Sequence, residues 1–523
     1  MKRLFVHRLL VISLLSVLPG FRSVLADSTA RFAKAVSLLS SSAYFQEISW
    51  WAADERKGRE PGTPESYQAA QRAADFFRSL GLEPAGTNGT YFQPFEEGGK
   101  RVVEVSKELT VNGRSFRYGR DWTLVAGPER CALKKCPVVF AGYGITERKL
   151  GYDDWRGVNP AGAAALVLRY EPQEIDPTSR WNGAKPTRGS SLVYKVNEAQ
   201  KHKARALLLV NGPLHHDPAS DPLLPFGSVG RFRSAIPFIH INEAVASSVL
   251  EPSGRMLLEL QNEIDMQEHP LSFRIPQTVV SFDAASRLLA PARNVVSMLR
   301  GSDPRLRHEV VVLGAHYDHI GLGFYGSRTP SRRGEVHNGA DDNASGTTGV
   351  LELAGALVHS GLTLRRSVLF VLFDAEEKGL LGSRYFINHP PVPLERIVAM
   401  INLDMIGHGE KGSCIVSGVG TAKAWPAILR EAEAGEPLTF RHLDSGPGGS
   451  DHLSFLGKKI PILFFCTGMH RYYHTPDDDA ETIDAEGAVT ILRVVLRTLI
   501  ETANRTERPS FKKAGPPRGK LHV

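Results

Sequence analysis

The amino-acid sequence predicts an α/β protein whose main domain has three layers, with a mixed, mostly parallel central sheet and helices on both faces. The chain has 523 residues, which exceeds the length at which one hydrophobic core keeps growing. Apolar strands alternate with helices from Asn294 onward, which is typical of a buried parallel sheet. A block of short strands precedes this region and indicates an inserted β-rich unit.

The first 26 residues have the features of a secretory signal peptide. They begin with a basic segment, continue with an apolar stretch over residues 9–18, and end at the small-residue site Val24-Leu25-Ala26. A membrane anchor is the weaker alternative, because the apolar stretch is shorter than the roughly 20 residues that a membrane span needs. We therefore expect an exported protein, periplasmic or extracellular, with no stable membrane anchor.

The charge of the chain argues against a dedicated nucleic-acid binder. Removal of the signal peptide lowers the formal net charge from +7 to +3, because it takes away four positive charges, those of Lys2, Arg3, Arg8 and Arg22. Part of the remaining excess lies in the basic tail, residues 506–523, which we expect to be disordered.

Four cysteines are too few to hold a chain of this length together by disulfides. Cys131 and Cys136 are close enough in sequence to pair after export, whereas Cys414 and Cys466 have the apolar neighbours of buried thiols. The sequence has no CxxC spacing, so any metal ion must be held by histidine and carboxylate side chains.

Three further regions follow the signal peptide. Residues 27–120 form the N-terminal part of the main domain, and a helix there begins where Thr63 caps and Pro64 opens the first turn. Residues 121–290 form the β-rich insert, with strands at 137–145, 164–170, 206–213 and 236–241 and a helix near 192–205. Residues 291–505 form the rest of the main domain, with strands at 310–316, 367–373, 399–404 and 460–465 and helices at 343–360, 379–388 and 484–503.

Polar side chains follow several of the predicted strands at their carboxyl ends, where ligands bind in sheets of this kind. The motifs are HYDH at 316–319, DAEEKG at 374–379 and NLDMIG at 402–407, joined by the loops GADDNASG at 339–346 and YYHTPDD at 472–478. Two histidines and three carboxylates suffice for a pair of zinc ions if one carboxylate bridges them. Asp341, Glu377 and Asp404 bring three negative charges against four positive ones, and a bridging hydroxide would neutralise the remainder.

The order of these motifs resembles that of the secreted two-zinc aminopeptidases, a family that includes glutamate carboxypeptidase and, with one zinc ion, glutaminyl cyclase. The resemblance covers about residues 60–500. The insert, with FAGYGI and PFIHI, resembles the protease-associated domain that many members carry. The resemblance implies that His316 and Asp404 bind one zinc ion, that Glu377 and His474 bind the other, and that Asp341 bridges them.

The same resemblance implies catalytic roles for three further residues. Asp318 would orient the imidazole of His316 through its ring N–H. Glu376 would be the general base, which deprotonates the metal-bound water and delivers the proton to the leaving amine. Tyr473 would donate a hydrogen bond to the tetrahedral oxyanion, with Tyr472 as the alternative.

Other polar residues near these motifs receive no metal or catalytic role. We expect Asp342 to be a helix cap or an outer hydrogen-bonding group, and His319 and His337 to make no direct metal bond. We interpret His308, His389 and His452 as surface or packing residues. A hydrolase triad of Ser450, Asp451 and His452 is disfavoured, because adjacent side chains rarely point at one another and the GxSxG motif is absent.

These features predict an exported zinc aminopeptidase, with two zinc ions per chain, that hydrolyses N-terminal peptide bonds of peptide substrates by a metal-bound hydroxide. A carboxypeptidase or dipeptidase of the same fold is the first alternative, since arginines near the metals would recognise a free carboxylate. Candidate arginines are Arg328, Arg332, Arg333 and Arg471. A catalytically inactive, receptor-like binding module is less favoured, because all five predicted ligands and the base are present. The sequence leaves the oligomeric state open.

Overall fold

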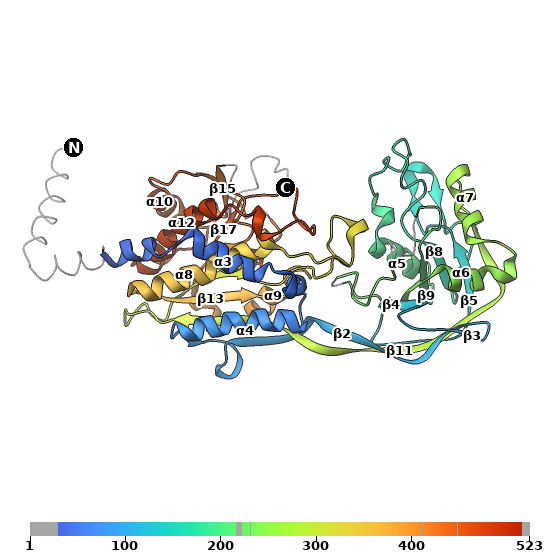
Figure 1. Cartoon of the computed structure of the whole chain (residues 1–523), viewed down its shortest axis with the longest axis horizontal. Helices are drawn as coiled ribbons and strands as arrows, with labels where there is room; N and C mark the ends of the chain where they lie inside the picture. The colour runs from blue at the N-terminus through green and yellow to red at the C-terminus, as the bar shows by residue number, and fades with distance from the viewer. Residues whose placement is uncertain (1–29, 216–221, 231, 410–411, 447, 515–523) are drawn as a thin grey trace, which may run out of the picture. The chain divides into compact units, whose positions relative to one another are not determined.

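The computed structural model describes residues 30–215, 222–230, 232–409, 412–446 and 448–514. The chain divides into two compact units (Figure 1). The main unit comprises the chain up to Glu97, Ala292–Gly321 and the chain from Val336 onward, and the inserted unit comprises Gly98–Pro291 and Leu322–Glu335. The predicted signal peptide, residues 1–26, lies outside the described residues.

The main unit is built on a mixed, mostly parallel sheet, which confirms the predicted fold class. The strand order is β16 (Thr439–Leu443), β15 (Ser413–Ser417), β17 (Ile462–Cys466), β14 (Ile397–Leu403), β12 (Val310–His316), β13 (Ser367–Phe373) and β11 (Ser272–Leu299). Strands β13, β12, β14 and β17 pair in parallel, whereas β11 is antiparallel to β13 and β15 is antiparallel to β17. The short β1 (Glu83–Pro84) pairs with the end of β11.

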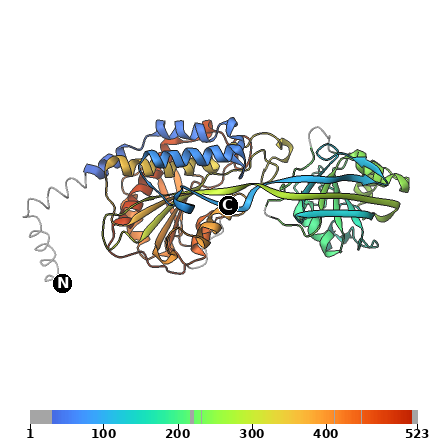
Figure 2. The same cartoon turned by 90° about the horizontal axis from the view of Figure 1, so that it is seen from below.

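Helices cover both faces of this sheet. One face packs against α3 (Ser41–Trp51), α4 (Pro64–Ser79), α8 (Gly346–Ser360) and α12 (Ala485–Asn504), and Figure 2 shows α3, α4 and α8 lying together over the strands. The other face packs against α9 (Leu381–Asn388) and α11 (His452–Leu456) through Phe386 and Phe455. The central strands β12, β13 and β14 are buried along their whole length and mostly apolar, because both of their faces are covered.

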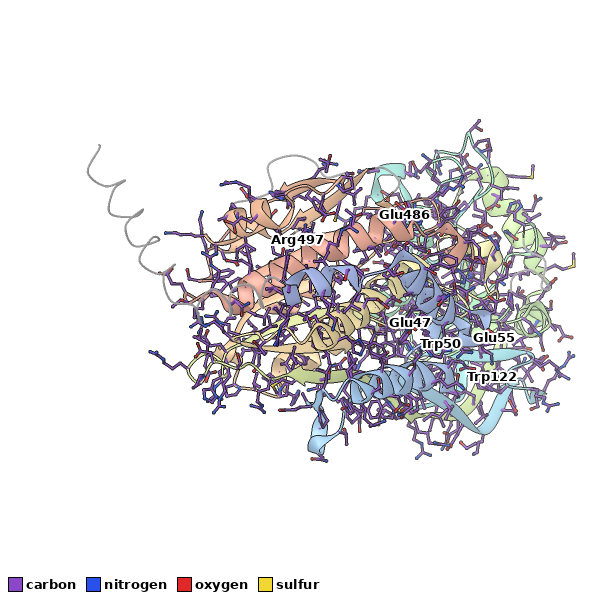
Figure 3. The ribbon with its side chains drawn as sticks, turned by 60° about the vertical axis from the view of Figure 1, so that its left-hand side comes forward. Glu47, Trp50, Glu55, Trp122, Glu486 and Arg497 are labelled. Carbon is purple, nitrogen blue, oxygen red and sulfur yellow. The ribbon has the colours of Figure 1, made fainter. Side chains whose placement is uncertain are left out.

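Two of these helices show why the chain forms them where it does. The side chain of Thr63 accepts a hydrogen bond from the backbone N–H of Ser66 at the start of α4, and Pro64 occupies the first turn, as predicted. Asp484 caps α12 in the same way, through the N–H of Gly487. Figure 3 shows α12 running past α3, with Arg497 on its surface, where the guanidinium lies 2.6 Å from Glu436 Oε1 beside α10 (Trp425–Ala432).

The parallel strands bring the predicted motifs to one edge of the sheet. His316 is the last residue of β12, Asp374 follows β13, and Asp404 follows β14. Strand β12 pairs with both β13 and β14, so these three carboxyl ends are neighbours. The register of the sheet therefore assembles residues that are far apart in the sequence.

The main strands of the inserted unit belong to the same hydrogen-bonded sheet, which they join through β11, and the unit also contains helices. Strands β5 (Arg130–Ala141), β8 (Ala164–Leu168), β9 (Ala206–Val210) and β10 (Phe238–Ile241) pair in parallel, and β4 (Trp122–Ala126) pairs antiparallel with β10. Strand β5 also pairs with the long β11, and β2 (Phe92–Val111) pairs with β3 (Arg114–Phe116). The remaining elements are β6 (Thr146–Glu147), β7 (Tyr152–Asp153), α5 (Leu192–Lys201), α6 (Glu243–Leu250) and α7 (Leu257–Gln267).

The structure draws the limits of the inserted unit differently from the predicted 121–290. The unit begins at Gly98, because β2 is one continuous strand from Phe92 to Val111. It also includes a second segment, Leu322–Glu335, that we predicted to be part of the main domain. Both cysteines on β5, Cys131 and Cys136, are buried free thiols.

The structure describes the tail only as far as residue 514. Phe511 forms an antiparallel bridge with Ala422, and the N–H of Lys512 donates to the carbonyl of Thr421. Within the described residues, no helix combines the length and the apolar character that crossing a membrane requires.

Candidate metal centre

Two groups of buried side chains at the carboxyl edge of the main sheet have the composition of metal sites. The first group is His316, Asp342 and Asp404, and the second is His319, Asp342, Glu377 and His474. Within each group, one nitrogen or oxygen atom from every residue lies within 4.8 Å of the others. Asp342 belongs to both groups, so its carboxylate lies between them.

The first group surrounds the imidazole of His316. His316 Nε2 lies 3.3 Å from Asp342 Oδ1 and 3.4 Å from Asp404 Oδ1. Asp404 Oδ1 is buried and has no hydrogen-bond partner. Burial lowers the pKa of His316, but the neighbouring carboxylates, Asp404 first among them, raise it well above its usual range.

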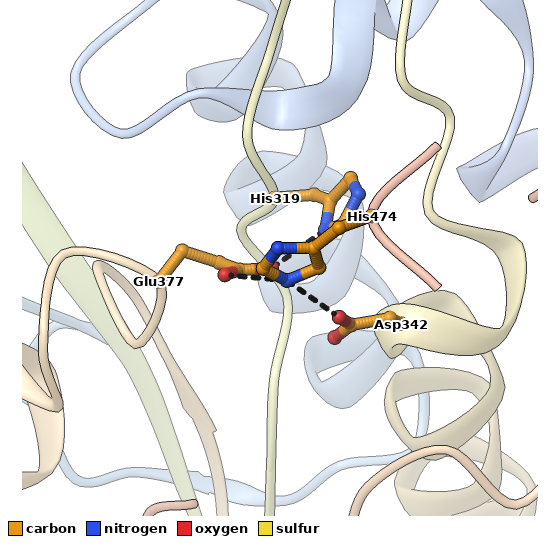
Figure 4. A group of neighbouring side chains, drawn as sticks. All are labelled: His319, Asp342, Glu377 and His474. Carbon is orange, nitrogen blue, oxygen red and sulfur yellow. Dashed lines mark hydrogen bonds and ion pairs between the residues drawn. The ribbon is translucent and has the colours of Figure 1, made fainter. Parts of the chain in front are cut away.

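The second group surrounds the carboxylate of Glu377 (Figure 4). Glu377 Oε2 lies 3.0 Å from His474 Nε2, and Glu377 Oε1 lies 2.7 Å from His319 Nδ1. His474 Nε2 also lies 3.1 Å from Asp342 Oδ2. Burial raises the pKa of Glu377, but the charge of His474 and the two histidine contacts lower it to about 2.

The loop that carries Asp342 is held by buried hydrogen bonds from several parts of the main unit. The carboxylate of Asp478 accepts from the backbone N–H groups of Asp341 and Asp342, at 2.9 and 3.1 Å. The side chain of Asn343 donates to the carbonyl of Leu403, just before Asp404. The fully buried guanidinium of Arg59 donates to the carbonyls of Asn338 and Gly339 at the start of the loop.

The structure contradicts the predicted position of Asp341. Its Oδ1 accepts a hydrogen bond from the N–H of Gly407 at 2.6 Å, and its Oδ2 lies 3.1 Å from His470 Nε2. Adjacent side chains in this loop point in different directions, so only Asp342 reaches both groups. The shared carboxylate is therefore that of Asp342, the residue to which we gave an outer or capping role.

Asp318 lies beside His316, but it contacts the ring differently from the prediction. His316 Nδ1 is 3.1 Å from the backbone carbonyl of Asp318 and 3.6 Å from its carboxylate. The carboxylate accepts hydrogen bonds from the backbone N–H groups of Glu376 and Glu377, at 3.0 and 3.3 Å. Asp318 thus fixes both His316 and the turn that carries the two glutamates.

Glu376 belongs to neither group, although it lies next to Glu377 in the turn that follows β13. Burial raises the pKa of its carboxyl well above the usual range, His316 lowers it, and the negative charges of Glu377, Asp451 and Asp404 raise it further. His316 and Asp404 of the first group, and Glu377 of the second, are among the charges that shift the pKa of Glu376. The two adjacent glutamates therefore have different surroundings.

The two tyrosines of the YYHTPDD loop also differ. The ring of Tyr473 stacks on that of His474 with centroids 3.9 Å apart, and burial together with Asp342 and Glu377 raises the pKa of Tyr473 far above its usual value. The ring of Tyr472 lies 5.9 Å from that of His408, and its hydroxyl accepts from Arg471.

The residues given no role are mostly where we expected them. His389 stacks on Tyr385 at an exposed site, and the ring of His452 stacks on Phe464. The hydroxyl of Ser450 accepts a hydrogen bond from Asn402, not from the adjacent residues of the disfavoured triad. Asp342 and His319 are the exceptions, since Asp342 belongs to both groups and His319 contacts Glu377 directly.

Sequence reasoning missed four residues that shape the centre: Asp342, whose role was given to its neighbour Asp341, and His319, Asp478 and Arg59. His319 follows His316 by three positions in HYDH, and that spacing was the only available signal for it. Asp478 lies in the same motif as His474, within a run of acidic residues. Such a run is usually interpreted as a solvent-exposed turn. Arg59 lies far from every motif, and nothing in the sequence marks it as buried.

Comparisons with known proteins match parts of this chain. Residues 294–499 match Peptidase family M28. Aminopeptidase YwaD of Bacillus subtilis (strain 168) is 29% identical over 230 residues, which are 42% of this chain and 46% of that protein. Leupeptin-inactivating enzyme 1 of Streptomyces exfoliatus is 29% identical over 174 residues, 33% of this chain and 35% of that enzyme. The chain therefore spans less than half the length of these curated relatives.

Solved structures share the fold over most of the chain. A zinc aminopeptidase from Bacillus subtilis aligns with a TM-score of 0.57 at 20% identity, over 89% of this chain and 96% of that one. An aminopeptidase from Aneurinibacillus sp. strain AM-1 aligns with a TM-score of 0.53 at 18% identity, over 94% of this chain and all (100%) of that one. At these identities the likeness shows the fold.

Proposed function

We propose that this chain is a zinc-dependent exopeptidase, an aminopeptidase that hydrolyses N-terminal peptide bonds, because its residues 294–499 match Peptidase family M28. The observation that carries the proposal is the buried carboxylate of Asp342, which lies between two groups of histidine and carboxylate side chains. One bridging carboxylate between two such groups is the arrangement that a pair of metal ions requires.

The residues present fit two zinc ions. His316 and Asp404 would hold one ion, Glu377 and His474 the other, and Asp342 would bridge them. Imidazole nitrogens and carboxylate oxygens are the donors that zinc takes in catalytic sites. A cation would satisfy Asp404 Oδ1, which is buried without a hydrogen-bond partner. When bound, zinc ions polarise a carbonyl group and lower the pKa of water.

We assign His319 to the positioning of Glu377. Its Nδ1 lies 2.7 Å from Glu377 Oε1, while the other carboxylate oxygen faces His474. A hydrogen bond of this kind fixes the orientation of a ligating carboxylate. Asp342, Glu377 and His474 then supply three protein donors, which leaves a position for water or substrate.

We assign Glu376 the role of general base. It is close enough to His316 and Asp404 for their charges to shift its pKa, yet it belongs to neither metal group. A carboxylate so placed takes a proton from the attacking water and delivers it to the leaving amine. Tyr473, packed on His474, is the residue that we assign to the developing oxyanion.

The arginines support an aminopeptidase over a carboxypeptidase or dipeptidase. Recognition of a substrate carboxylate would need a guanidinium facing the centre. Arg471 instead stacks over the ring of Tyr472 at 4.5 Å, and Arg332 pairs with Glu335 at 2.8 Å.

We also propose that the protein is exported and that the inserted unit is a protease-associated domain. The pattern of residues 1–26 supports export, and the FAGYGI and PFIHI motifs of the insert support the second assignment.

Substrates with free and blocked amines test the proposal. The purified chain, loaded with zinc, should hydrolyse aminoacyl-anilides with a free α-amine and leave the N-acetylated forms intact. Equal rates on the two substrates would contradict the aminopeptidase assignment. Hydrolysis of N-blocked peptides at their C-terminal bond would establish the carboxypeptidase alternative.

A further inference from the structure

A third group of potential metal ligands lies in the main unit, apart from the two groups already described. It consists of Asp341, His408 and His470, and one donor atom from each residue lies within 4.8 Å of the others. The exposed fractions of these residues are 0%, 4% and 8%, so the group is almost completely buried. The proposed zinc centre uses none of these three side chains.

The carboxylate of Asp341 is only half satisfied by the protein. Its Oδ1 accepts from the N–H of Gly407 at 2.6 Å. Its Oδ2 is buried and has no hydrogen-bond partner, although His470 Nε2 lies only 3.1 Å away. Neither ring nitrogen of His470 has a hydrogen-bond partner. Two atoms this close without hydrogen-bond geometry have the arrangement of two ligands that face a common ion.

The second imidazole completes the group. The rings of His408 and His470 lie with their centroids 4.0 Å apart and their planes at 30°. The ring of Tyr472 lies 5.9 Å from that of His408 and 6.0 Å from that of His470, and it helps to cover the group. Three donors of this kind are therefore gathered in a site that is shielded from solvent.

We propose that Asp341, His408 and His470 form a third metal site, which takes a transition-metal ion of the zinc type. Two imidazole nitrogens and one carboxylate oxygen match the three-ligand sets of zinc, with a fourth position for water. Magnesium and calcium prefer sites made of oxygen ligands, so the two imidazoles disfavour them. One divalent ion would satisfy Asp341 Oδ2 and His470 Nε2 together.

The positions of the three residues along the chain give this site a structural role. Asp341 adjoins Asp342, His408 follows Asp404 by four residues, and His470 precedes His474 by four residues. An ion held by the third group therefore ties together the three loops that carry ligands of the proposed two-zinc centre. It supports these loops without contact with the reacting atoms.

Counting metal ions in matched variants tests the third site. The full chain is saturated with zinc, desalted, and measured by inductively coupled plasma mass spectrometry. We expect His408→Phe to hold one ion per chain fewer than the unmodified protein. Asp341→Asn should also lose one ion, although it keeps the volume of the side chain and an oxygen for the N–H of Gly407. His389→Phe, at an exposed histidine outside every group, should lose none.

The ion counts separate failure of this proposal from failure of the proposed function. Three ions in the unmodified chain and two in His408→Phe support both proposals. One ion in the unmodified chain and none in His408→Phe would support the third site and contradict the proposed two-zinc centre. Equal counts in the unmodified chain, His408→Phe and Asp341→Asn would overturn it, and His470 would then be an ion-pair partner of Asp341. If His408→Phe does not fold, the count for Asp341→Asn decides.

Discussion

Two sites, one in each unit, differ in how the protein surrounds a buried carboxylate: Asp154 in the inserted unit and the candidate metal centre in the main unit. In the inserted unit, the buried carboxylate of Asp154 accepts from the N–H groups of Tyr143 and Ile145, at 3.1 and 3.0 Å, and from the hydroxyl of Tyr152, at 2.8 Å. The buried ammonium of Lys195 donates to the carbonyl of Tyr143. Both carboxylate oxygens and the ammonium therefore have partners within the protein.

In the main unit, several buried carboxylates lie close together, and the chain does not supply a hydrogen-bond donor for every carboxylate oxygen. Asp404 Oδ1 and Asp341 Oδ2 are buried without hydrogen-bond partners. Asp342 lies within 3.3 Å of two different imidazoles. A buried charge needs a partner, and the partners of Asp154 lie within the chain. The unpartnered carboxylate oxygens of the main unit would instead be satisfied by a bound cation.

Removal of metal should have the largest effect and should affect only one unit. Dialysis against a chelator should abolish peptide hydrolysis, because the main unit would lose the cations that its carboxylates require, and added zinc should restore it. Scanning calorimetry should show a lower unfolding temperature for the main unit and an unchanged transition for the inserted unit. Full activity in a metal-free preparation would contradict the claim that the buried carboxylates of the main unit require metal ions.

Substitution of Glu376 should lower the catalytic rate without changing metal binding. We expect Glu376→Gln to lower kcat by about 10³-fold, since general-base catalysis contributes about 10²- to 10⁴-fold. Its metal content should not change, because Glu376 belongs to neither group. The matched variant Glu377→Gln should lose metal, because both oxygens of Glu377 face histidines of the second group. Normal activity in both variants would refute the two assignments.

Substitution of either tyrosine by phenylalanine should have a smaller effect on kcat. Tyr473→Phe removes one hydrogen-bond donor to the oxyanion, and we expect kcat to fall about 10²-fold with little change in KM. Tyr472→Phe should change kcat less than about threefold, because that ring packs on His408 and His470. A larger loss in Tyr472→Phe would reverse the assignment.

The fold of the main unit could be predicted because its central strands are mostly apolar and fully buried. Val310–His316 and Ser367–Phe373 are buried along their whole length, and each ends at a polar motif. The edge at which these motifs meet follows from the parallel pairing. The histidines and glutamates of the proposed centre could therefore be found from the sequence.

The choice between Asp341 and Asp342 could not be made in the same way. The two residues have the same side chain, and only the backbone of the loop, held by Asp478, decides which of them lies between the two groups. The start of the inserted unit was missed for a related reason. The unit begins at Gly98, inside the single strand β2, and the Gly98-Gly99 pair at that point does not end the strand.

The smallest effect on activity should come from Asp154 in the inserted unit. Asp154→Ala leaves two buried N–H groups without an acceptor, and we expect a loss of about 2 kcal/mol or more in the free energy of unfolding of that unit. Asp154→Asn is the matched control. Its amide oxygen can accept from both N–H groups, and its NH₂ can donate to the Tyr152 hydroxyl, so it should lose less. Denaturant unfolding followed by the fluorescence of Trp122 and Trp181 would measure both variants.

The pH dependence of the same variants tests whether Asp154 is buried as a charge. Burial raises its pKa from the usual 3.8 to about 7, so the folded unit favours the protonated carboxyl. The stabilisation from that proton is complete at low pH and is lost as the pH rises through this range. The unmodified unit should therefore lose stability relative to Asp154→Asn between about pH 4 and pH 7. A constant difference across that range would show that Asp154 takes up no proton there, and that its partners within the chain already suffice for the charged form.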